Sequence, residues 1–325
     1  MSTMQYRNLG RTGLKVSELC LGTMTFKWTS SESDSLAVLD RAREAGINFI
    51  DTADVYTRWA QGNPGGTAET IIGNWMKGKP REEFVIATKV RGRMWDGPNG
   101  EGLSRVHIIK ACEDSLRRLQ TDHIDLYQCH HPDDATPLDE TLGAFDDLVR
   151  AGKVRHIGLS NYPAWLTAKT LWVSERRNLV AVVSTQPRYN IVHRDEFERE
   201  LQPLCAAEGI GVIPYSPLQG GFLTGKYKRG KAAPSGSRGE NNARIKEFIE
   251  NPRAFDVLEK LEAVGRAHDK SIAETALAWL LTNPTITSPI IGANTVAQLN
   301  ALLGAAGYRL SADEMKELDE ASKGF

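Results

Sequence analysis

Eight short apolar runs, several rich in β-branched residues, recur along the chain, and this repetition limits the folds that it can adopt. Longer segments with apolar residues at helical spacing separate the runs, as in Ser104–Leu119, where Ser104 can cap a helix. Strands that alternate with helices form parallel sheets, and eight such units favour a closed (β/α)8 TIM barrel over an open dinucleotide-binding sheet. The predicted strands are Leu19–Gly22, Asn48–Asp51, Phe84–Lys89, Ile124–His130, His156–Ser160, Val180–Gln186, Gly211–Tyr215 and Ser288–Gly292.

Three features extend this plain barrel. A turn signal at Gly10–Gly13, before the first strand, predicts a small N-terminal β-hairpin that covers one end of the barrel. The long interval between the last two strands contains a polar, Gly- and Ser-rich stretch, Lys226–Arg244, and loops of this kind usually act as lids or are disordered. Ser311–Gly324 predicts an extra C-terminal helix. No linker interrupts the pattern, so we expect a single domain over residues 1–325.

The composition narrows the class of protein. The chain has 40 basic and 41 acidic residues, so its charge does not favour nucleic acid or an anionic membrane surface. It contains no apolar stretch near the ~20 residues that cross a bilayer, and the first residues do not resemble a signal peptide. The four cysteines follow no disulfide or metal-binding spacing. We expect a cytoplasmic protein that acts on a small molecule, as a monomer or a homo-oligomer.

Four polar residues end or follow the predicted strands in a way that indicates proton-transfer chemistry. Asp51, Lys89 and His130 end three neighbouring strands, and Tyr56 follows Asp51 after five residues. In barrel enzymes the reacting groups gather at these strand ends. A lysine ammonium stabilises a phenolate and lowers the pKa of a tyrosine, so Tyr56 could protonate an oxygen that gains negative charge. Asp51 would hold Lys89, and His130 would orient a carbonyl oxygen.

Two other interpretations use the same residues. Asp51 and Lys89 alone could form a structural salt bridge at the barrel top. His130 and His131, with Asp133 and Asp134, invite a metal site. Neighbouring residues of a strand point to opposite faces, however, so we expect that the two histidines do not share one ion.

Further strand-end residues suit a planar ring that carries a carboxamide. Ser160, Asn161 and Gln186 offer donors and acceptors, and Tyr215 offers an aromatic face. After Tyr215, the stretch GGFLTGKY at residues 220–227 resembles a phosphate-binding loop, except that Tyr227 replaces the hydroxyl that would hold Mg²⁺. It remains a glycine-rich loop whose Lys226 could contact a phosphate.

Tryptophans in the loops after the first three strands could form the wall of an apolar substrate pocket. Packing of these loops onto the barrel rim explains each of them equally well. The residues concerned are Trp28, Trp59 and Trp95.

Taken together, these motifs resemble the aldo-keto reductase superfamily across essentially the whole chain, and within it a bacterial NADP-dependent branch related to potassium-channel β-subunit-like members. The matching stretches are RNLGRTGLKVSELCLGTMTF, FIDTADVY, FVIATKV, SLRRLQTDHIDLYQCHHPD, GLSNY, QPRYN, PYSPLQGGFLTGKY and IIGANTVAQL. The resemblance implies a barrel that binds NADPH without a Rossmann fold. It places the catalytic residues at Asp51, Tyr56, Lys89 and His130.

The resemblance also implies where the cofactor lies. Ser237 and Arg238 align with a contact to the 2′-phosphate, which favours NADP. Asn294 stands where many relatives have a basic residue, which keeps NAD as the alternative. The implied cofactor contacts are Thr23, Met24, Asp51, Ser160, Asn161, Gln186, Tyr215, Ser216, Leu218, Gly220, Lys226, Ser237, Arg238, Gly292, Asn294, Thr295 and Gln298.

Three functions compete at this point. The first is an NADPH-dependent oxidoreductase that reduces an aldehyde or ketone, including a ketosugar or other cyclic carbonyl. The second is a cofactor-binding regulatory subunit of the potassium-channel β-subunit type, with little turnover. The third is a metal-dependent barrel hydrolase. The loops contain no motif that identifies the substrate.

Overall fold

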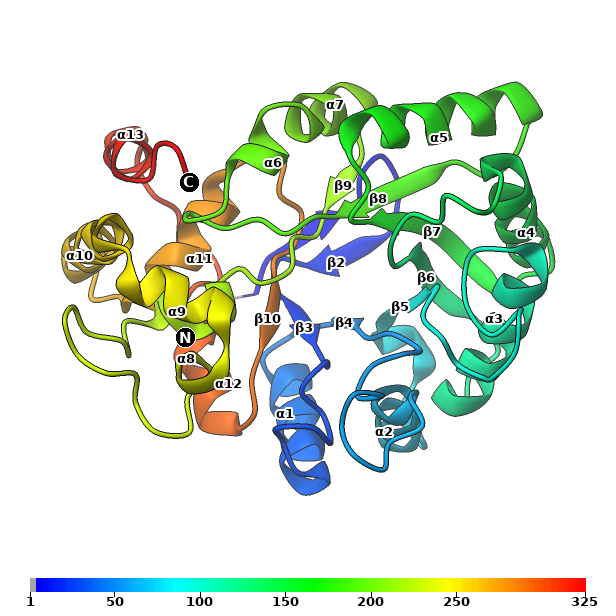
Figure 1. The fold of residues 1–325 in the computed structure, drawn as a ribbon, viewed down its shortest axis with the longest axis horizontal. Coiled ribbons are helices and arrows are strands. Elements are labelled where there is room, and N and C mark those ends of the chain that lie inside the picture. Colours follow the sequence, from blue (N-terminus) through cyan, green and yellow to red (C-terminus); the bar gives the residue numbers. More distant parts are fainter. Residues whose placement is uncertain (1–3) are drawn as a thin grey trace.

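The computed structural model describes residues 4–325 and shows eight parallel strands that curl into a barrel with helices outside it (Figure 1). Hydrogen bonds between the first and last strand segments close the ring: Ile290 N–H donates to Pro214 O at 2.9 Å and Thr287 N–H to Val212 O at 2.8 Å. The predicted barrel is confirmed. In spatial order its strands are β10 (Ile290–Gly292), β3 (Cys20–Gly22), β4 (Phe49–Asp51), β5 (Val85–Val90), β6 (Ile124–Cys129), β7 (Val154–Ser160), β8 (Val182–Gln186) and β9 (Gly211–Val212).

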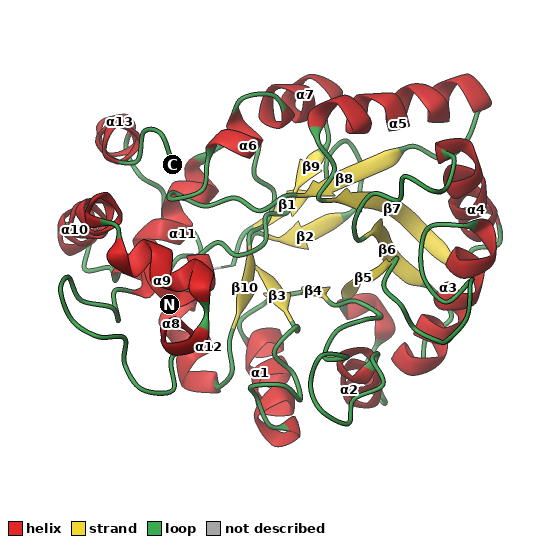
Figure 2. Cartoon of the chain, in the orientation of Figure 1, coloured by secondary structure: helices red, strands yellow, loops and turns green. Residues whose placement is uncertain are grey.

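Helices form the outer layer of the barrel (Figure 2). Capping residues fix several of their starts; Ser104 accepts a hydrogen bond from His107 N–H, as the sequence predicts for this helix. The helices that surround the sheet are α1 (Glu32–Glu44), α2 (Thr67–Met76), α3 (Arg105–Leu119), α4 (Leu138–Arg150), α5 (Ala164–Arg177), α6 (Asp195–Glu198), α7 (Leu201–Glu208), α11 (Ile272–Thr282) and α12 (Val296–Leu303), with the 3-10 turn η1 (Arg81–Glu83) before β5.

The interval between β9 and β10 is helical over much of its length. It forms the 3-10 turn η2 (Gln219–Thr224) and then α8 (Arg238–Asn241), α9 (Ala243–Glu250) and α10 (Pro252–Arg266) before α11. The residues between η2 and α8 form an irregular loop. The predicted C-terminal helix is confirmed as α13 (Ala312–Ala321), which packs beside α10 (Figure 1).

The predicted N-terminal hairpin is confirmed as β1 (Tyr6–Asn8) and β2 (Lys15–Ser17), which pair antiparallel. Arg11 N–H donates to Gly209 O at 2.9 Å, so the hairpin turn lies against the segment that enters β9. The fully buried Glu18 follows β2, accepts a hydrogen bond from Gly307 N–H and pairs with Arg309. The hairpin is therefore tied to the opposite end of the chain.

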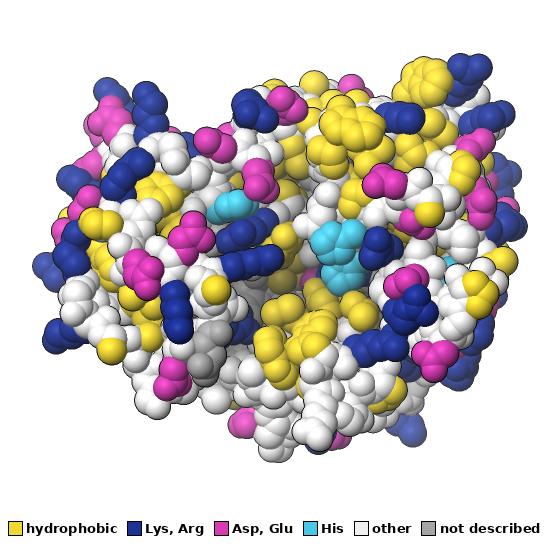
Figure 3. Space-filling view, in the orientation of Figure 1, with side chains coloured by type: hydrophobic (Ala, Val, Ile, Leu, Met, Phe, Trp, Pro, Cys, Tyr) yellow, Lys and Arg dark blue, Asp and Glu magenta, His cyan; other side chains and the backbone are white. Residues whose placement is uncertain are grey.

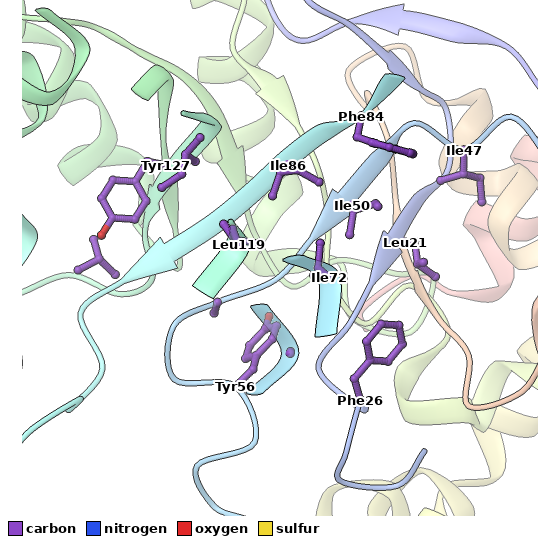
Figure 4. Close-up of a cluster of buried hydrophobic side chains, with 14 of the residues drawn as sticks. Leu21, Phe26, Ile47, Ile50, Tyr56, Ile72, Phe84, Ile86, Leu119 and Tyr127 are labelled. Atoms are coloured by element: carbon purple, nitrogen blue, oxygen red, sulfur yellow. The ribbon is translucent and has the colours of Figure 1, made fainter. Parts of the chain in front are cut away.

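Alternation along the strands separates two apolar layers. Residues such as Phe49, Ala87 and Leu126 pack with hairpin residue Leu9 in one cluster, whereas Ile50 and Ile86 pack with helix residues in another. Figure 4 shows part of the second layer, in which Tyr56 and Phe26 also lie. The inward-facing series of β4 continues from Phe49 to Asp51, so the series turns polar at the carboxyl end of the strand.

Candidate active site

A buried lysine forms the centre of the site. The parallel pairing of the strands brings Asp51 of β4 beside Ala87 of β5, two residues before Lys89. Lys89 Nζ donates to Asp51 Oδ2 at 2.6 Å, to Thr52 O at 2.8 Å and to Tyr56 Oη at 2.9 Å. These three acceptors use the three protons of an ammonium, and the lysine has no solvent exposure. The structure thus brings together the predicted Asp51, Tyr56 and Lys89.

The charges of this cluster decide which groups hold protons. Burial alone would lower the pKa of Lys89, but Asp51 and Tyr56 outweigh it and raise that pKa above its usual value. For Tyr56 the balance is reversed: burial raises the pKa to about 12, although the Lys89 charge acts in the opposite direction. The expectation of a lowered tyrosine pKa is therefore wrong for the net effect, because loss of hydration exceeds the attraction of one ammonium. Both groups are protonated at neutral pH.

His130 lies at the end of β6 beside this cluster. Its ring centroid is 5.9 Å from that of Tyr56, with the ring planes 71° apart. Burial, reinforced by the positive charge of Lys89, holds the pKa of His130 well below its usual value, so the ring is neutral. A neutral imidazole has one N–H to donate and one nitrogen to accept with.

Strand alternation predicts that His130 and His131 point to opposite faces, but in the structure they do not. The two rings stack at 5.3 Å with planes 20° apart. The reason is that β6 ends at Cys129, one residue earlier than predicted, so the alternation no longer applies. Within residues 4–325, no cluster of three or more His, Cys, Asp or Glu side chains is arranged to hold a metal ion.

Gln128 is a member of the buried network that the sequence analysis did not identify. Asp51 Oδ1 accepts hydrogen bonds from Gln186 Nε2 at 2.9 Å and from Gln128 Nε2 at 3.4 Å, and Gln186 Nε2 also lies 3.2 Å from Gln128 Oε1. Gln128 lies within β6, two residues after the inward-facing Leu126, so the alternation pattern could have found it. Its role is to orient the second oxygen of Asp51.

The residues predicted to bind the carboxamide lie at the ends of β7 and β8, and Tyr215, predicted to stack on the ring, lies three residues beyond β9. Ser160 is paired with Gln186 in the sheet, and its hydroxyl donates to Gln186 O at 2.9 Å. Asn161 has a φ of 61°, and its Nδ2 donates to His130 O at 2.9 Å while its Oδ1 accepts from Tyr215 Oη at 2.9 Å. These contacts fix the positions of the Asn161 amide and the Tyr215 ring around the mouth of the barrel. The amide nitrogen of Gln186 is already bound to Asp51, which differs from a free carboxamide contact.

The segment after β9 forms a glycine-lined turn. Gly220 and Gly221 have φ values of 61° and 97°, and a Cβ at either residue would lie within 3 Å of Ile245 Cδ1 or Lys226 Nζ, respectively. Ser216 and Leu218 lead into this turn, and the Ser216 carbonyl accepts a hydrogen bond from Asn190 Nδ2 at 2.9 Å. Side chains larger than a hydrogen atom therefore do not fit at these two positions. The turn offers its backbone and the Lys226 ammonium there instead.

Ser237 and Arg238 begin α8, beyond the irregular loop. The Ser237 hydroxyl oxygen is buried and has no hydrogen-bond partner within residues 4–325. Arg238 lies with its guanidinium 5.7 Å from the ring centroid of Trp28, and burial lowers its pKa. An unsatisfied buried hydroxyl and a desolvated guanidinium on consecutive residues fit an anionic group.

The predicted adenosine-side residues lie at the start of α12, after Gly292 at the end of β10. Thr295 caps the helix, accepting from Gln298 N–H, and Gln298 Oε1 accepts from Asn294 N–H at 2.8 Å. Asn294 also bonds to the loop after β3 through Thr29 and Ser30. Thr23 and Met24 lie at the opening of that loop; Thr23 is buried and its hydroxyl donates to Asp51 O at 3.0 Å.

Two of the three predicted pocket tryptophans meet beside Tyr56. Trp28 and Trp59 pack edge to face at 5.5 Å, and Trp59 lies 6.2 Å from the Tyr56 ring. Both are large exposed side chains, at 42% and 49%. Trp95 packs instead on His107 of α3, with the ring centroids 4.6 Å apart and the planes tilted by 30°. The space-filling view shows a hollow on the face seen in Figure 3. Histidine and hydrophobic side chains lie on one side of it, and Lys or Arg side chains on another.

Comparison with known proteins shows the family to which the chain belongs. The aldo/keto reductase family model matches residues 18–323. This chain belongs to the aldo/keto reductase family. It is 41% identical to an uncharacterized oxidoreductase, YrpG, of Bacillus subtilis over 99% of this chain and 97% of that protein.

Other relatives of this aldo/keto reductase carry different names. The chain is 37% identical to a probable voltage-gated potassium channel subunit beta of Arabidopsis thaliana, over 91% of this chain and 89% of the relative. It is 32% identical to the versiconal hemiacetal acetate reductase of Aspergillus parasiticus, over 98% of this chain and 96% of the relative. Family membership therefore supports an oxidoreductase that acts on small carbonyl compounds.

Aldo/keto reductases use nicotinamide dinucleotides, and the residues described above fit such a group. The glycine-lined turn with Lys226, together with the unpartnered Ser237 hydroxyl and Arg238, matches the charge of its phosphates. At the start of α12, the cap residue Thr295 and its hydrogen-bond partner Gln298 lie next to Asn294. No helix among residues 4–325 is both long and apolar enough to cross a membrane.

Proposed function

We propose that this chain is an NADPH-dependent reductase of aldehydes or ketones, in which Tyr56 protonates the carbonyl oxygen. The observation that carries the proposal is the contact of the buried Lys89 Nζ with both Tyr56 Oη and Asp51 Oδ2. When bound, the nicotinamide supplies a hydride to the carbonyl carbon. The oxygen then gains negative charge and takes the hydroxyl proton of Tyr56, which yields the alcohol.

Each residue has a distinct part in this step. Tyr56 keeps its proton at neutral pH because its pKa is about 12. As the proton leaves, the ammonium of Lys89 stabilises the phenolate at 2.9 Å. Asp51 holds Lys89 in place and is itself oriented by Gln128 and Gln186. The neutral His130 donates its ring N–H to the carbonyl oxygen and so orients the substrate.

The cofactor would lie across the mouth from α12 to Tyr215. Ser160, Asn161 and Gln186 would surround the carboxamide and Tyr215 would stack on the ring. The turn Ser216–Gly220, with Leu218 and Lys226, would hold the diphosphate. Ser237 and Arg238 would bind the 2′-phosphate, since a guanidinium suits a phosphate, and Gly292, Asn294, Thr295 and Gln298 would contact the adenosine.

The substrate would contact the exposed ring faces of Trp28 and Trp59 next to Tyr56, which suits an apolar or ring-shaped carbonyl, including ketosugars. Trp95 is left out of this wall because its ring packs on His107. All four cysteines are buried and unpaired, which is consistent with a reducing compartment such as the cytoplasm.

The deciding experiment titrates the purified protein with NADPH and with NADH and follows tryptophan fluorescence. We expect tighter binding of NADPH than of NADH, and Arg238→Gln is expected to remove most of that difference. Equal binding of the two by the wild type would reject the 2′-phosphate site and leave the preference for NADP unsupported. Binding of neither would reject the reductase function itself.

A second candidate is a cofactor-binding regulatory subunit, which the similarity to plant potassium-channel β-subunits supports. A screen of aldehydes and ketones with bound NADPH separates the two. Turnover of several substrates, abolished by Tyr56→Phe, favours the enzyme. Tight cofactor binding without turnover of any carbonyl favours the regulatory subunit.

A further inference from the structure

Arg91 is a cation in an unusual backbone conformation directly beside the catalytic cluster. It follows the last residue of β5 and lies two positions after Lys89. Its neighbour on β6 is His130, whose N–H donates to the Val90 carbonyl at 3.0 Å. The side chain of Arg91 is part-buried and its Nε is enclosed.

The backbone at Arg91 is held in place against its own preference. Its φ is 141°, in a region that favours glycine, and such conformations persist only where surrounding contacts impose them. Two contacts do so here. The Arg91 carbonyl accepts a hydrogen bond from Gly102 N–H at 2.9 Å, and Gly92 packs so closely on Val55 that a Cβ would lie 2.6 Å from that side chain. Strain of this kind is concentrated at functional sites.

No acid among residues 4–325 forms a direct ion pair with the guanidinium of Arg91. Within residues 4–325 its side chain makes no hydrogen bond and no ion pair within 4.0 Å, and Nε is a buried donor without a partner. Its charge reaches His130 and His131 and contributes to the lowered pKa of both rings. It also reaches Asp133, but that carboxylate already accepts hydrogen bonds from Leu103 N–H, Ala135 N–H and the Thr136 hydroxyl.

We propose that Arg91 binds an anionic group of the carbonyl substrate, so that the enzyme prefers aldehydes or ketones that carry a carboxylate or a phosphate. This inference rests on the proposed reductase function and names its substrate class. A buried, unpartnered donor on a fixed backbone gains a charge-assisted hydrogen bond when an anion enters. The position beside His130 places that anion next to the carbonyl that Tyr56 would protonate.

The first test compares 4-formylbenzoate with its neutral methyl ester, which differ in one negative charge at the same distance from the aldehyde. Wild-type kcat/KM is expected to be higher for the acid, and the KM of the acid to increase with ionic strength. Arg91→Gln is expected to lower the acid-to-ester ratio of kcat/KM at least about tenfold, in keeping with the strength of one charge-assisted contact. Arg91→Lys, which keeps the charge, should restore part of the ratio.

Arg93→Gln is the matched control. Arg93 lies in the same loop, but it is exposed and already paired with Glu101, so its loss should leave the ratio unchanged. If Arg91→Gln lowers kcat/KM equally for acid and ester, Arg91 is a structural residue and the inference is wrong. The same conclusion follows if Arg93→Gln changes the ratio as much as Arg91→Gln does. Glyceraldehyde 3-phosphate against glyceraldehyde repeats the comparison and distinguishes a phosphate from a carboxylate.

Failure of the reductase function would give a different pattern. If neither aldehyde is turned over, binding of 4-formylbenzoate and of its ester to the NADP⁺-saturated protein is measured by tryptophan fluorescence, since Trp28 and Trp59 lie at the site. Tighter binding of the acid, lost in Arg91→Gln, would retain the anion site without the activity. Equal binding of acid and ester would reject the anion site.

Discussion

The ammonium nitrogen of Lys89 lies 2.9 Å from the hydroxyl oxygen of Tyr56 and 4.7 Å from the centroid of its ring. The cation thus contacts the tyrosine both at the atom that would lose a proton and near the face of the ring that would delocalise the resulting charge. Any phenolate that forms at Tyr56 is stabilised without movement of the surrounding groups, which is the arrangement expected of a preorganised proton donor.

Tyr56→Phe removes the proposed donor and keeps the ring. We expect kcat for carbonyl reduction to fall about 10³-fold, within the range attributed to a positioned general acid. NADPH binding, followed by fluorescence, should change little. Tyr127→Phe is the matched control, because the Tyr127 hydroxyl is buried without a hydrogen-bond partner on the outer side of the sheet. Equal activity of the two variants would refute the role of Tyr56.

Lys89→Met leaves the buried carboxylate of Asp51 without its cation. Breaking a buried ion pair on one side typically destabilises by about 3–5 kcal/mol, and we expect a loss of this size in urea denaturation. The double variant Lys89→Met with Asp51→Asn removes both charges and should recover part of the loss. If the two single changes simply add in the double variant, the pair is not energetically coupled.

The pH dependence of reduction follows from the protonation of Tyr56. A pKa of about 12 means that the donor keeps its proton throughout the neutral and moderately alkaline range. The kcat for carbonyl reduction should therefore be flat from about pH 6 to pH 9, since the free-group pKa of a tyrosine is already near 10. The reverse oxidation needs the deprotonated form and should become faster as the pH increases. A fall in reduction near pH 7 would show that another group limits the step.

Histidine burial predicts that the protein loses stability in weak acid. Burial is the main cause of a lowered pKa for His107, His130, His131, His156 and His193. Near and below pH 6.5 the unfolded chain binds protons that the folded chain binds less well, so the free energy of unfolding decreases as the pH falls. Denaturation at pH 7.5 and 5.5 measures the difference. His156→Gln, away from the catalytic cluster, should reduce it; an unchanged difference would exclude this residue as a contributor.

Arg91→Gly separates stability from specificity. A non-glycine residue at a φ of 141° stores strain, of order 1–3 kcal/mol for such positions, and glycine removes it at an entropic cost of about 0.5–1 kcal/mol. We expect the free energy of unfolding to increase by about 1 kcal/mol while the preference for anionic aldehydes is lost. A decrease in stability would show that the Arg91 side chain contributes more packing than its backbone costs.

The barrel and the strand-end residues could be predicted because both depend on short-range patterns. Alternation of strands and helices indicates the barrel, and the last polar residue of an apolar run marks the carboxyl end of each strand. Asp51, Lys89 and His130 follow from this rule, and their proximity follows from the parallel order of β4, β5 and β6. The helices between β9 and β10 are harder to predict from the sequence, because polar, Gly-rich residues precede α8.

The remaining features depend on contacts between distant segments. Gln128 gives no sign in the sequence of its bonds to Asp51 and Gln186, which lie 77 residues before it and 58 residues after it. The stacking of His130 on His131 depends on β6 ending at Cys129. The net pKa of Tyr56 depends on how completely the fold removes water, which no local pattern reports.

The bond between the hairpin and the end of the chain has a consequence for synthesis on the ribosome. Glu18 emerges among the first residues, yet its partners Gly307 and Arg309 are among the last, and β3 must likewise wait for β10. A nascent chain therefore has an unpaired β3 edge, and a Glu18 carboxylate with Arg7 as its cation but without Gly307 and Arg309, until β10 and these two residues have been synthesised. The barrel can close only after β10 has left the exit tunnel, so its cooperative folding waits for that strand.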